Sequence, residues 1–353
     1  MKKKKKKRVG RQILSAVILL LICALVFATV YVRRKLNLIQ YDDGTVVDNT
    51  VDPDDSIFQD DIDITGLTVV REEEIVLPEI DPPTDDDVLN ILLLGTDERS
   101  LEFTDAARSD AIMLVSLNFK EKTGRLISFE RGMGVPILGG QYEGQYDWLT
   151  HCFRYGGADL MLKEIRECFN VDVDKYVRVN FNALILIVDA VGGVDLEFTD
   201  NEASYINYDK DNRYWIDDDH PIQRVTSGVN HVNGATALMY ARCRHIDSDW
   251  HRIERQRNLV QAFTNELKGA DVATLDKLLE EILPLVKTNF TQAELLNLMT
   301  KAPSMLGIQF AQMTIPVEGT YGGMTVMGGR GSFAPDFKKN AEILREFLYG
   351  PDA

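Results

Sequence analysis

The hydrophobic pattern of the chain changes twice along its length. An uncharged and mostly apolar run comes first, at 12–32, and a polar stretch with few aromatic residues follows at 41–88. From 89 to 353, short apolar runs alternate with segments whose apolar residues recur every three or four positions. Such alternation is typical of α/β and α+β proteins. It predicts one domain at 89–353, with a central mixed sheet flanked by helices.

The expected strands are short apolar runs bounded by glycine or charged residues. The first is 88–94, which ends at Gly95. Further strands are expected at 111–118, 125–130, 176–181, 194–198 and 308–317, with a short one at 66–70. Helices are expected where apolar residues recur with helical spacing. They are 157–169, 182–191, 233–241, 252–268, 275–285, 292–299 and 336–348. Asn182 is the expected N-cap of the second of these helices.

Cationic residues flank the first apolar run unequally. Eight Lys or Arg precede it and three follow it, and its 21 residues are enough to cross a bilayer as a helix. Because Lys and Arg favour the cytoplasmic side, we expect a cytoplasmic basic tail at 1–11, a transmembrane helix at 12–32 and an extracellular body. A cleaved signal peptide is the rival interpretation, but its apolar core is usually shorter and no A-x-A-like site follows the run.

The segment 33–88 is expected to be an acidic extracellular linker. Positions 41–88 hold 17 Asp or Glu and a single Arg, in a chain whose net charge is −16. Clusters such as 52–55 and 81–87 repel one another and cannot bury a core. Calcium binding by these clusters would need the order of an EF-hand loop, which they lack. The acidic body also argues against nucleic-acid binding, which depends on cations that neutralise phosphates.

Common catalytic motifs are absent from the sequence. Its four cysteines form no C-x-x-C pair, its five histidines form no H-x-x-x-H pair, and no phosphate-binding glycine loop is present. Arginines instead stand where strands and helices begin or end. They are Arg108, Arg131, Arg242, Arg244 and Arg252, the last sharing a helix face with Gln256. A guanidinium group matches phosphate in a bidentate manner, but ion pairs with the many carboxylates explain the pattern equally well.

Two carboxylates also stand at strand ends. Asp97 follows the first strand and Asp110 opens the second. At one edge of a sheet, such a pair can hold Mg²⁺ that bridges phosphate oxygens. The alternative is turn capping, which Asp commonly provides after a strand.

Seven segments resemble, in the same order, motifs of the LytR-CpsA-Psr proteins of bacterial envelopes. They include A-R-S-D at 107–110, V-D-A-V-G-G-V at 188–194, Y-A-R-C-R at 240–244 and R-I-E-R-Q at 252–256. The resemblance covers about residues 89–260. It implies an α/β/α-type domain with an apolar lipid pocket and arginines at its mouth.

The resemblance also implies a function. Such a protein is a membrane-anchored phosphotransferase of a Gram-positive-type envelope. It moves an anionic glycopolymer, such as teichoic acid or capsule, from a polyprenyl-pyrophosphate carrier to peptidoglycan. By motif position, the pyrophosphate would be bound by Arg108, Arg131, Arg242, Arg244, Arg252 and Gln256. The catalytic residues would be Arg108, Arg131 and Asp110, and Mg²⁺ would be held by Asp97 and Asp110.

The chain departs from the family pattern at three positions. Gly132 stands where an Asp follows the arginine, Glu130 replaces a proline, and Trp148 stands where Lys is frequent. Strand alternation predicts that the side chain of Glu130 points away from that of Arg131. These departures leave open a second function, a non-catalytic envelope protein that binds polyprenyl phosphates or wall polymer. A transcription regulator is a third possibility, which an extracellular body contradicts.

Overall fold

The computed structural model describes residues 31–42, 61–98, 101–104, 107–208, 220–243, 246–268 and 272–350. The predicted basic tail and nearly all of the predicted span at 12–32 lie outside these residues. Within the described part of the chain, no helix combines the length and the apolar character needed to cross a membrane.

A seven-stranded mixed sheet forms the centre of the molecule, as the apolar runs predict. Its order is β1 (Gln40–Tyr41), β10 (Lys287–Thr288), β7 (Lys175–Asn180), β2 (Val88–Thr96), β3 (Ser109–Asn118), β4 (Thr123–Phe129) and β11 (Phe310–Ile315). The strands β2, β3 and β4 are antiparallel, whereas β7 runs parallel to β2 and β11 runs parallel to β4. The ends of β2 and β3 that carry Asp97 and Asp110 therefore meet at one edge of the sheet.

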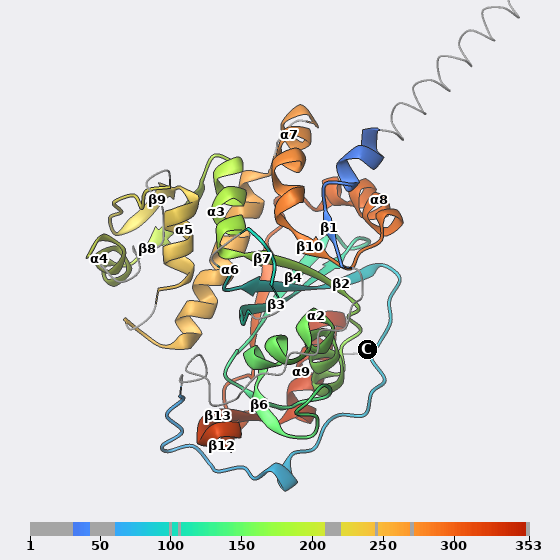
Figure 1. Ribbon diagram of the computed structural model, residues 1–353, viewed down its shortest axis with the longest axis vertical. Coiled ribbons are helices and arrows are strands. Elements are labelled where there is room, and N and C mark those ends of the chain that lie inside the picture. Colours follow the sequence, from blue (N-terminus) through green and yellow to red (C-terminus); the bar gives the residue numbers. More distant parts are fainter. Residues whose placement is uncertain are drawn as a thin grey trace, which may run out of the picture.

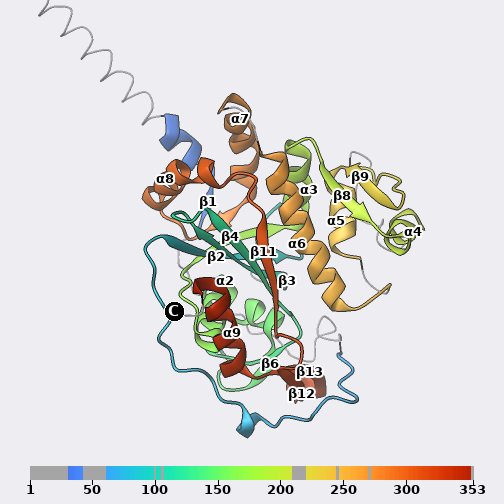
Figure 2. The same ribbon diagram turned by 180° about the vertical axis from the view of Figure 1, so that it is seen from behind.

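Helices cover both faces of this sheet, which confirms the α/β/α arrangement (Figures 1 and 2). On one face lie α2 (Leu149–Phe169) and α9 (Phe337–Tyr349). The other face carries α3 (Phe181–Ala190), α5 (Gly234–Ala241), α6 (Asp249–Glu266) and α7 (Val272–Ile282). The helix α8 (Gln292–Lys301) lies beside β1 and the helical turn at 31–36.

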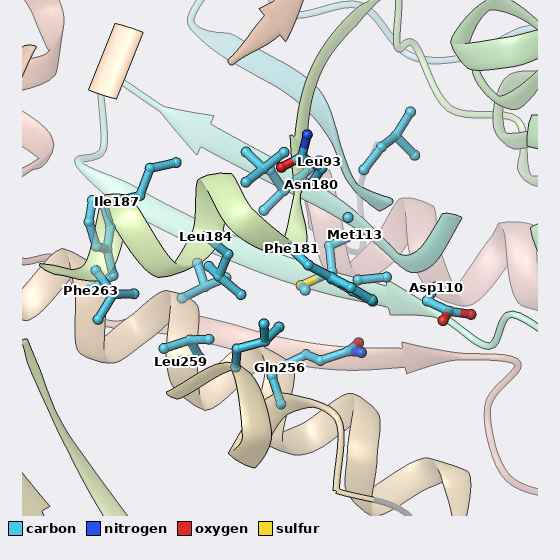
Figure 3. Close-up of a pocket in the computed structure, with 18 of the residues that line it drawn as sticks. Leu93, Asp110, Met113, Asn180, Phe181, Leu184, Ile187, Gln256, Leu259 and Phe263 are labelled. Atoms are coloured by element: carbon cyan, nitrogen blue, oxygen red, sulfur yellow. The ribbon is translucent and has the colours of Figure 1, made fainter. Parts of the chain in front are cut away.

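The pleat of the central strands divides their side chains between the two faces. Leu92, Leu114 and Tyr176 are fully buried in the main core, together with Phe153 of α2. Leu93, one position along β2, points to the face covered by α3 and α6 (Figure 3). Because successive residues of a strand alternate, the same strands build two different environments.

Three small antiparallel pairs lie outside the central sheet. They are β5 (Gly134–Pro136) with β6 (Tyr146–Trp148), β8 (Val194–Phe198) with β9 (Gly228–Val232), and β12 (Tyr321–Val326) with β13 (Arg330–Pro335). The predicted strand 194–198 is therefore present as β8, but it pairs outside the main sheet. It packs with α4 (Asp200–Tyr208) and α5 in a separate small core.

Two predicted boundaries are wrong for physical reasons. Asn180, rather than Asn182, is the N-cap of α3, because its side chain accepts a hydrogen bond from the amide of Ala183 at 2.9 Å. The helix α2 begins at Leu149, eight residues earlier than expected. Its backbone is non-helical at Gly156 and Gly157, and the predicted start at 157 is this interruption rather than the beginning of the helix. Glycine tolerates the positive φ of 65° at position 157.

The described part of the acidic segment, 61–87, runs along the surface of the domain (Figure 1). Its side chains at Ile75 and Leu77 pack against the main core. The predicted strand at 66–70 is reduced to a single bridge, in which Val70 donates a backbone hydrogen bond to Gly323 at 2.8 Å. This part of the segment is therefore attached to the domain through apolar and backbone contacts.

Candidate active site

An apolar slot lies between the central sheet and the helices α3, α5 and α6. Its volume is about 300 Å³, and it is lined by strand residues such as Leu93 and Met113 and by helix residues such as Leu184, Ile187 and Phe263. Figure 3 shows these apolar side chains along the slot, with Asp110 at the side away from Ile187 and Phe263. The slot is shaped for an extended apolar chain with a polar group at one end.

Apart from Asn180, the polar side chains that line the slot are four residues that the sequence singled out. They are Asp110, Arg242, Arg252 and Gln256. Arg252 and Gln256 are one turn apart on α6, so both reach the same side of the helix. Arg242 follows α5, and its guanidinium group lies 4.6 Å from the ring of Phe181. Arg244 lies outside the described residues.

A cluster of ion pairs, here called the mouth cluster, joins two of these residues to the end of β4. Arg131 donates to Asp110 at 3.0 Å and to Asp249 at 3.4 Å, and Arg252 donates to Asp249 at 2.7 Å. The guanidinium group of Arg131 also lies 5.9 Å from the ring of Trp148. These contacts fix two guanidinium groups beside the slot before any ligand arrives, which is the preorganisation that anion binding needs.

Arg108 forms a second pair, with Asp97. The side chain of Asp97 accepts from the amide of Arg108 at 2.8 Å and from its Nε at 3.1 Å. Both side chains are about one-fifth exposed, so the pair is partly open to solvent. The structure thus brings together Arg131, Arg252 and Asp110, and it places Arg108 with Asp97 at the neighbouring strand end.

Other buried arginines have structural roles. Arg255, although it lies next to Gln256 on α6, forms ion pairs with Glu202 and Asp247 and donates to the carbonyl of Cys243. Arg178 is 2% exposed, forms an ion pair with Glu98, and lies over the ring of Phe153 on the α2 face. The guanidinium groups of both residues are therefore used in ion pairs within the fold.

The sequence analysis missed one acidic residue of the site, Asp249, and placed another, Glu130, wrongly. Asp249 bridges both arginines of the mouth cluster, and its spacing of three residues from Arg252 on a helix was the available signal. Glu130 lines the same cavity as Arg131, so the prediction that it points away is wrong. The chain turns after β4, where the amide of Met133 donates to the carbonyl of Glu130, and strand alternation no longer applies.

The departures at 130, 132 and 148 form one local arrangement. A side chain at position 132 would have its Cβ 2.3 Å from Ile62 and 3.5 Å from Oε1 of Glu130. The carboxylate of Glu130 therefore lies beside the position that a side chain at 132 would occupy. Trp148 is 2% exposed and donates from its indole nitrogen to the carbonyl of Gly331 at 2.9 Å.

The carboxylates at the strand ends are suited to a cation that arrives with phosphate. Asp97 and Asp110 lie on neighbouring antiparallel strands, joined by a backbone hydrogen bond between Asp97 and Arg108. Each carboxylate is already paired with a guanidinium group. Since Mg²⁺ takes one or two carboxylates and completes its octahedron with water and phosphate oxygens, these two residues fit it as a partial set of ligands.

Comparison with known proteins identifies close relatives. The polyisoprenyl-teichoic acid–peptidoglycan teichoic acid transferase TagT of Bacillus subtilis (strain 168) is 30% identical over 254 residues, which are 70% of this chain and 74% of TagT. A solved structure of TagT bound to LI-WTA superposes with a TM-score of 0.58 at 28% identity, and covers 74% of this chain and 90% of that one.

A further TagT structure holds octaprenyl pyrophosphate lipid. It superposes with a TM-score of 0.54 at 26% identity, covering 74% of this chain and 89% of that one. The model of the LytR_cpsA_psr family matches residues 63–344, which include every strand of the central sheet except β1. With the motifs, the fold and the mouth cluster in agreement with this match, the chain belongs to the LytR_cpsA_psr family.

Proposed function

We propose that the protein transfers an anionic glycopolymer of the teichoic acid type from a polyprenyl-pyrophosphate carrier to peptidoglycan. The observation that carries this proposal is the apolar slot, which ends at the guanidinium groups of Arg242 and Arg252. A polyprenyl pyrophosphate has the same division into an apolar chain and an anionic head. The relative TagT is named as a teichoic acid transferase, and one TagT structure holds octaprenyl pyrophosphate.

The geometry supports phosphoryl transfer by charge stabilisation. With the lipid chain in the slot, the pyrophosphate lies beside Arg131, Arg252 and Gln256, and Arg242 approaches from the end of α5. When the acceptor hydroxyl attacks the phosphorus atom that carries the glycopolymer, the bond to the bridging oxygen breaks and polyprenyl phosphate leaves. Guanidinium groups held in place by carboxylates stabilise the charge that develops on this leaving group.

We further propose that Asp97 and Asp110 hold Mg²⁺ when the pyrophosphate is bound. The ion would supply additional neutralisation of the phosphate oxygens. Because the two carboxylates are paired with arginines in the empty protein, Mg²⁺ alone should bind weakly, and octaprenyl pyrophosphate should tighten its binding at least about tenfold. Calorimetric titration of Mg²⁺ with and without the lipid checks this. Equal affinities would contradict the metal role, and Asp97→Asn should abolish the difference.

The placement of the protein in the envelope is part of the proposal. The run at 12–32 would span the membrane with the amino terminus in the cytoplasm, which the eight-to-three excess of preceding cations supports. A reporter domain fused after Ala353 should then be active outside the cell. A fusion that works only in the cytoplasm would contradict this orientation.

A binding assay tests the anion site. The double variant Arg242→Ala with Arg244→Ala should bind octaprenyl pyrophosphate about a hundredfold more weakly, since each charge-assisted contact contributes roughly 1.5–3 kcal/mol. Arg345→Ala, an exposed position on α9 at the opposite face, is the matched control and should bind normally. Wild-type affinity in the double variant would place the site elsewhere. In a transfer assay with lipid-linked glycan and peptidoglycan, the wild-type chain should release polyprenyl phosphate.

The second function left open by the sequence, binding without catalysis, gains no support from the structure. It depended on Gly132 and Trp148. Oε1 of Glu130 lies 3.5 Å from where a Cβ at position 132 would be, and the side chain of Trp148 is buried in the fold.

A further inference from the structure

A second cavity adjoins the mouth cluster. Its volume is about 380 Å³, and it shares Arg252 with the apolar slot while Arg131 and Asp249 also line it. The rest of its lining has a different character from the slot, with aromatic rings from Trp148, Trp250 and Phe333 and carboxylates from Asp61, Glu130 and Asp247. A reacting group bound at the mouth cluster is therefore accessible from two cavities, one apolar and one polar.

The lining of the second cavity selects the kind of ligand that it can hold. Ionised carboxylates only accept hydrogen bonds, so they favour a ligand rich in hydroxyl and amide donors and disfavour a polyanion. The half-buried ring of Trp250 packs 5.7 Å from Phe333 and 5.8 Å from Tyr321, which gives a rigid aromatic wall. Aromatic faces with convergent polar groups suit the apolar and hydroxylated sides of a sugar ring. The cavity thus fits a saccharide with few phosphates better than a teichoic acid.

Glu130 lies within this cavity at the boundary with the mouth cluster. Its side chain is fully buried, and Oε1 accepts from the amide of Gly132 at 3.2 Å. No described residue donates a hydrogen bond to Oε2, which is also buried. In the ionised form, this oxygen has no hydrogen bond from the described residues that a new donor would have to replace.

The neighbours of Glu130 set its proton affinity. Burial, and then the negative charge of Asp249, raise the pKa of Glu130 to about 8. In its protonated form Glu130 donates a hydrogen bond to Asp249, which favours that form further. The positive charges of Arg252 on α6 and of Arg131 oppose this shift. Burial, and then the negative charges of Glu318 and Glu130, raise the pKa of Tyr321 on β12. Asp61 and Asp247 are the remaining acids of the cavity.

We propose that this cavity binds the acceptor saccharide of peptidoglycan and that Glu130 receives the proton of the attacking hydroxyl. The inference rests on the proposed function and names the acceptor side of the same reaction. The hydroxyl oxygen forms a bond to the phosphorus that carries the glycopolymer, its proton moves to the carboxylate of Glu130, and the bond to the bridging oxygen breaks as polyprenyl phosphate leaves. The proton then passes to solvent, which restores the carboxylate for the next turnover.

The position of Glu130 explains how the chain functions with glycine at 132. Its carboxylate lies beside the position that a side chain at 132 would occupy, on the same side of the mouth cluster as the aromatic wall. Introducing Asp at 132 would require Ile62 to move and would place two acids together. Gly132→Asp is therefore expected to lower transfer, the opposite of what the family pattern alone would indicate.

A binding experiment tests the cavity. The full-length chain, in detergent, is titrated with a soluble tetrasaccharide of the peptidoglycan glycan strand. Trp250→Ala should weaken binding about tenfold or more, whereas Tyr208→Ala, an exposed aromatic residue on α4, should leave it unchanged. Unchanged tetrasaccharide binding in Trp250→Ala overturns the assignment. The assignment is also overturned if Trp250→Ala lowers the affinity for the lipid-linked teichoic acid alone. The cavity would then bind the donor substrate of the reaction and not the acceptor.

A single-turnover transfer assay tests Glu130. The wild-type rate should rise about tenfold per pH unit and level off near pH 8, because only the ionised carboxylate accepts a proton. Glu130→Gln should slow transfer roughly 10²–10⁴-fold and remove this pH dependence, with tetrasaccharide binding within about twofold of wild type. Glu130→Asp should restore part of the rate.

Glu164→Gln is the matched control, since Glu164 is also fully buried but lies on α2, away from both cavities. It should keep the wild-type rate and its pH profile. Thermal unfolding of each variant checks that it is folded. Transfer by Glu130→Gln at the wild-type rate, or with an unchanged pH profile, overturns the role of Glu130. A wild-type chain that binds no octaprenyl pyrophosphate and transfers nothing would instead overturn the proposed function itself.

Discussion

The two faces of the central sheet are built from the same strands, yet they are covered differently. One face forms the main core with its helices, and the other borders the apolar slot. On the α2 face, Leu92 and Leu114 are fully buried in the main core, which also contains residues of α2. On the α3 face, Leu93 and Met113 border a slot of about 300 Å³. The strand residues are equally apolar on both sides, so the difference comes from how the covering helices are placed.

This contrast separates stability from ligand binding within one sheet. Close packing maximises van der Waals contacts between side chains and leaves little room for a ligand. The side chains that border an apolar slot have fewer such contacts, and a bound lipid chain can supply the missing ones. The α2 face should therefore dominate the free energy of unfolding, and the α3 face should dominate lipid affinity. Neighbouring residues on one strand allow this division to be tested directly.

The largest expected effect is on the packed face. Leu92→Ala should lower the free energy of unfolding by about 2–5 kcal/mol, because it leaves a cavity in a filled core. Leu93→Ala should cost clearly less, since the side chain already borders an open slot. Urea unfolding of the two variants measures the difference. Equal losses would mean that the slot is filled by its own side chains and that the two faces do not differ.

A smaller effect is expected when the slot is made narrower. Leu184→Trp should weaken the binding of octaprenyl pyrophosphate about tenfold, or roughly 1.4 kcal/mol, because the larger ring takes space that the lipid chain needs. Val229→Trp, at an exposed position on β9, is the control and should bind like wild type. Direct lipid titration measures both. If Leu184→Trp bound the lipid normally, the lipid chain would have to lie outside the slot.

The third prediction concerns a buried acid of the packed face. Glu164 accepts from the amide of Leu138 at 2.8 Å, and burial raises its pKa to about 8. Its protonated form is favoured in the folded protein, so this contribution to stability is fully present below the unfolded pKa near 4.5 and is lost as pH rises toward 8. One proton accounts for a slope of at most about 1.4 kcal/mol per pH unit.

Glu164→Gln should remove that slope from the pH dependence of unfolding. Urea unfolding between about pH 5 and pH 8 compares the variant with the wild type. A slope identical to that of the wild type would show that Glu164 is ionised in the folded protein, and the packed face would then tolerate a buried charge.

Much of this architecture is predictable from the sequence. Continuous apolar runs such as 88–94 and 111–118 are typical of strands that are buried on both faces of a central sheet. Asp97 and Asp110 were predictable as neighbours for the same reason. The short pairs β5–β6 and β12–β13 were missed, since three to six residues rich in glycine give no periodic signal. The strand 194–198 was predicted, but its pairing with β9 was not, because a hydrophobic run does not reveal its partner.

The site was predictable only where its residues share a local element. Arg252 and Gln256 lie one turn apart, and helical spacing alone places them together. The side chain of Glu130 was placed wrongly because the chain turns after β4, where side chains no longer alternate between two faces. That turn depends on contacts with residues distant in the sequence. One of them is Ser332, which donates to the carbonyl of Gly132 at 2.8 Å. The sequence does not distinguish the roles of Arg178 and Arg242. In the folded chain, Arg178 forms an ion pair with Glu98, whereas Arg242 lines the apolar slot.

The first described residues of the chain are attached to the helix that borders the slot. Lys35 pairs with Asp276 and Glu280 of α7 at 2.9 and 2.6 Å, and Figures 1 and 2 show the turn at 31–36 beside that helix. The residues that end α7 and follow it contribute Ile282 and Val286 to the slot. With the proposed span in the bilayer, this attachment holds the slot next to the lipid surface. The carrier then reaches the enzyme by lateral diffusion in two dimensions, at an effective concentration set by the short tether and not by the concentration of free lipid in water.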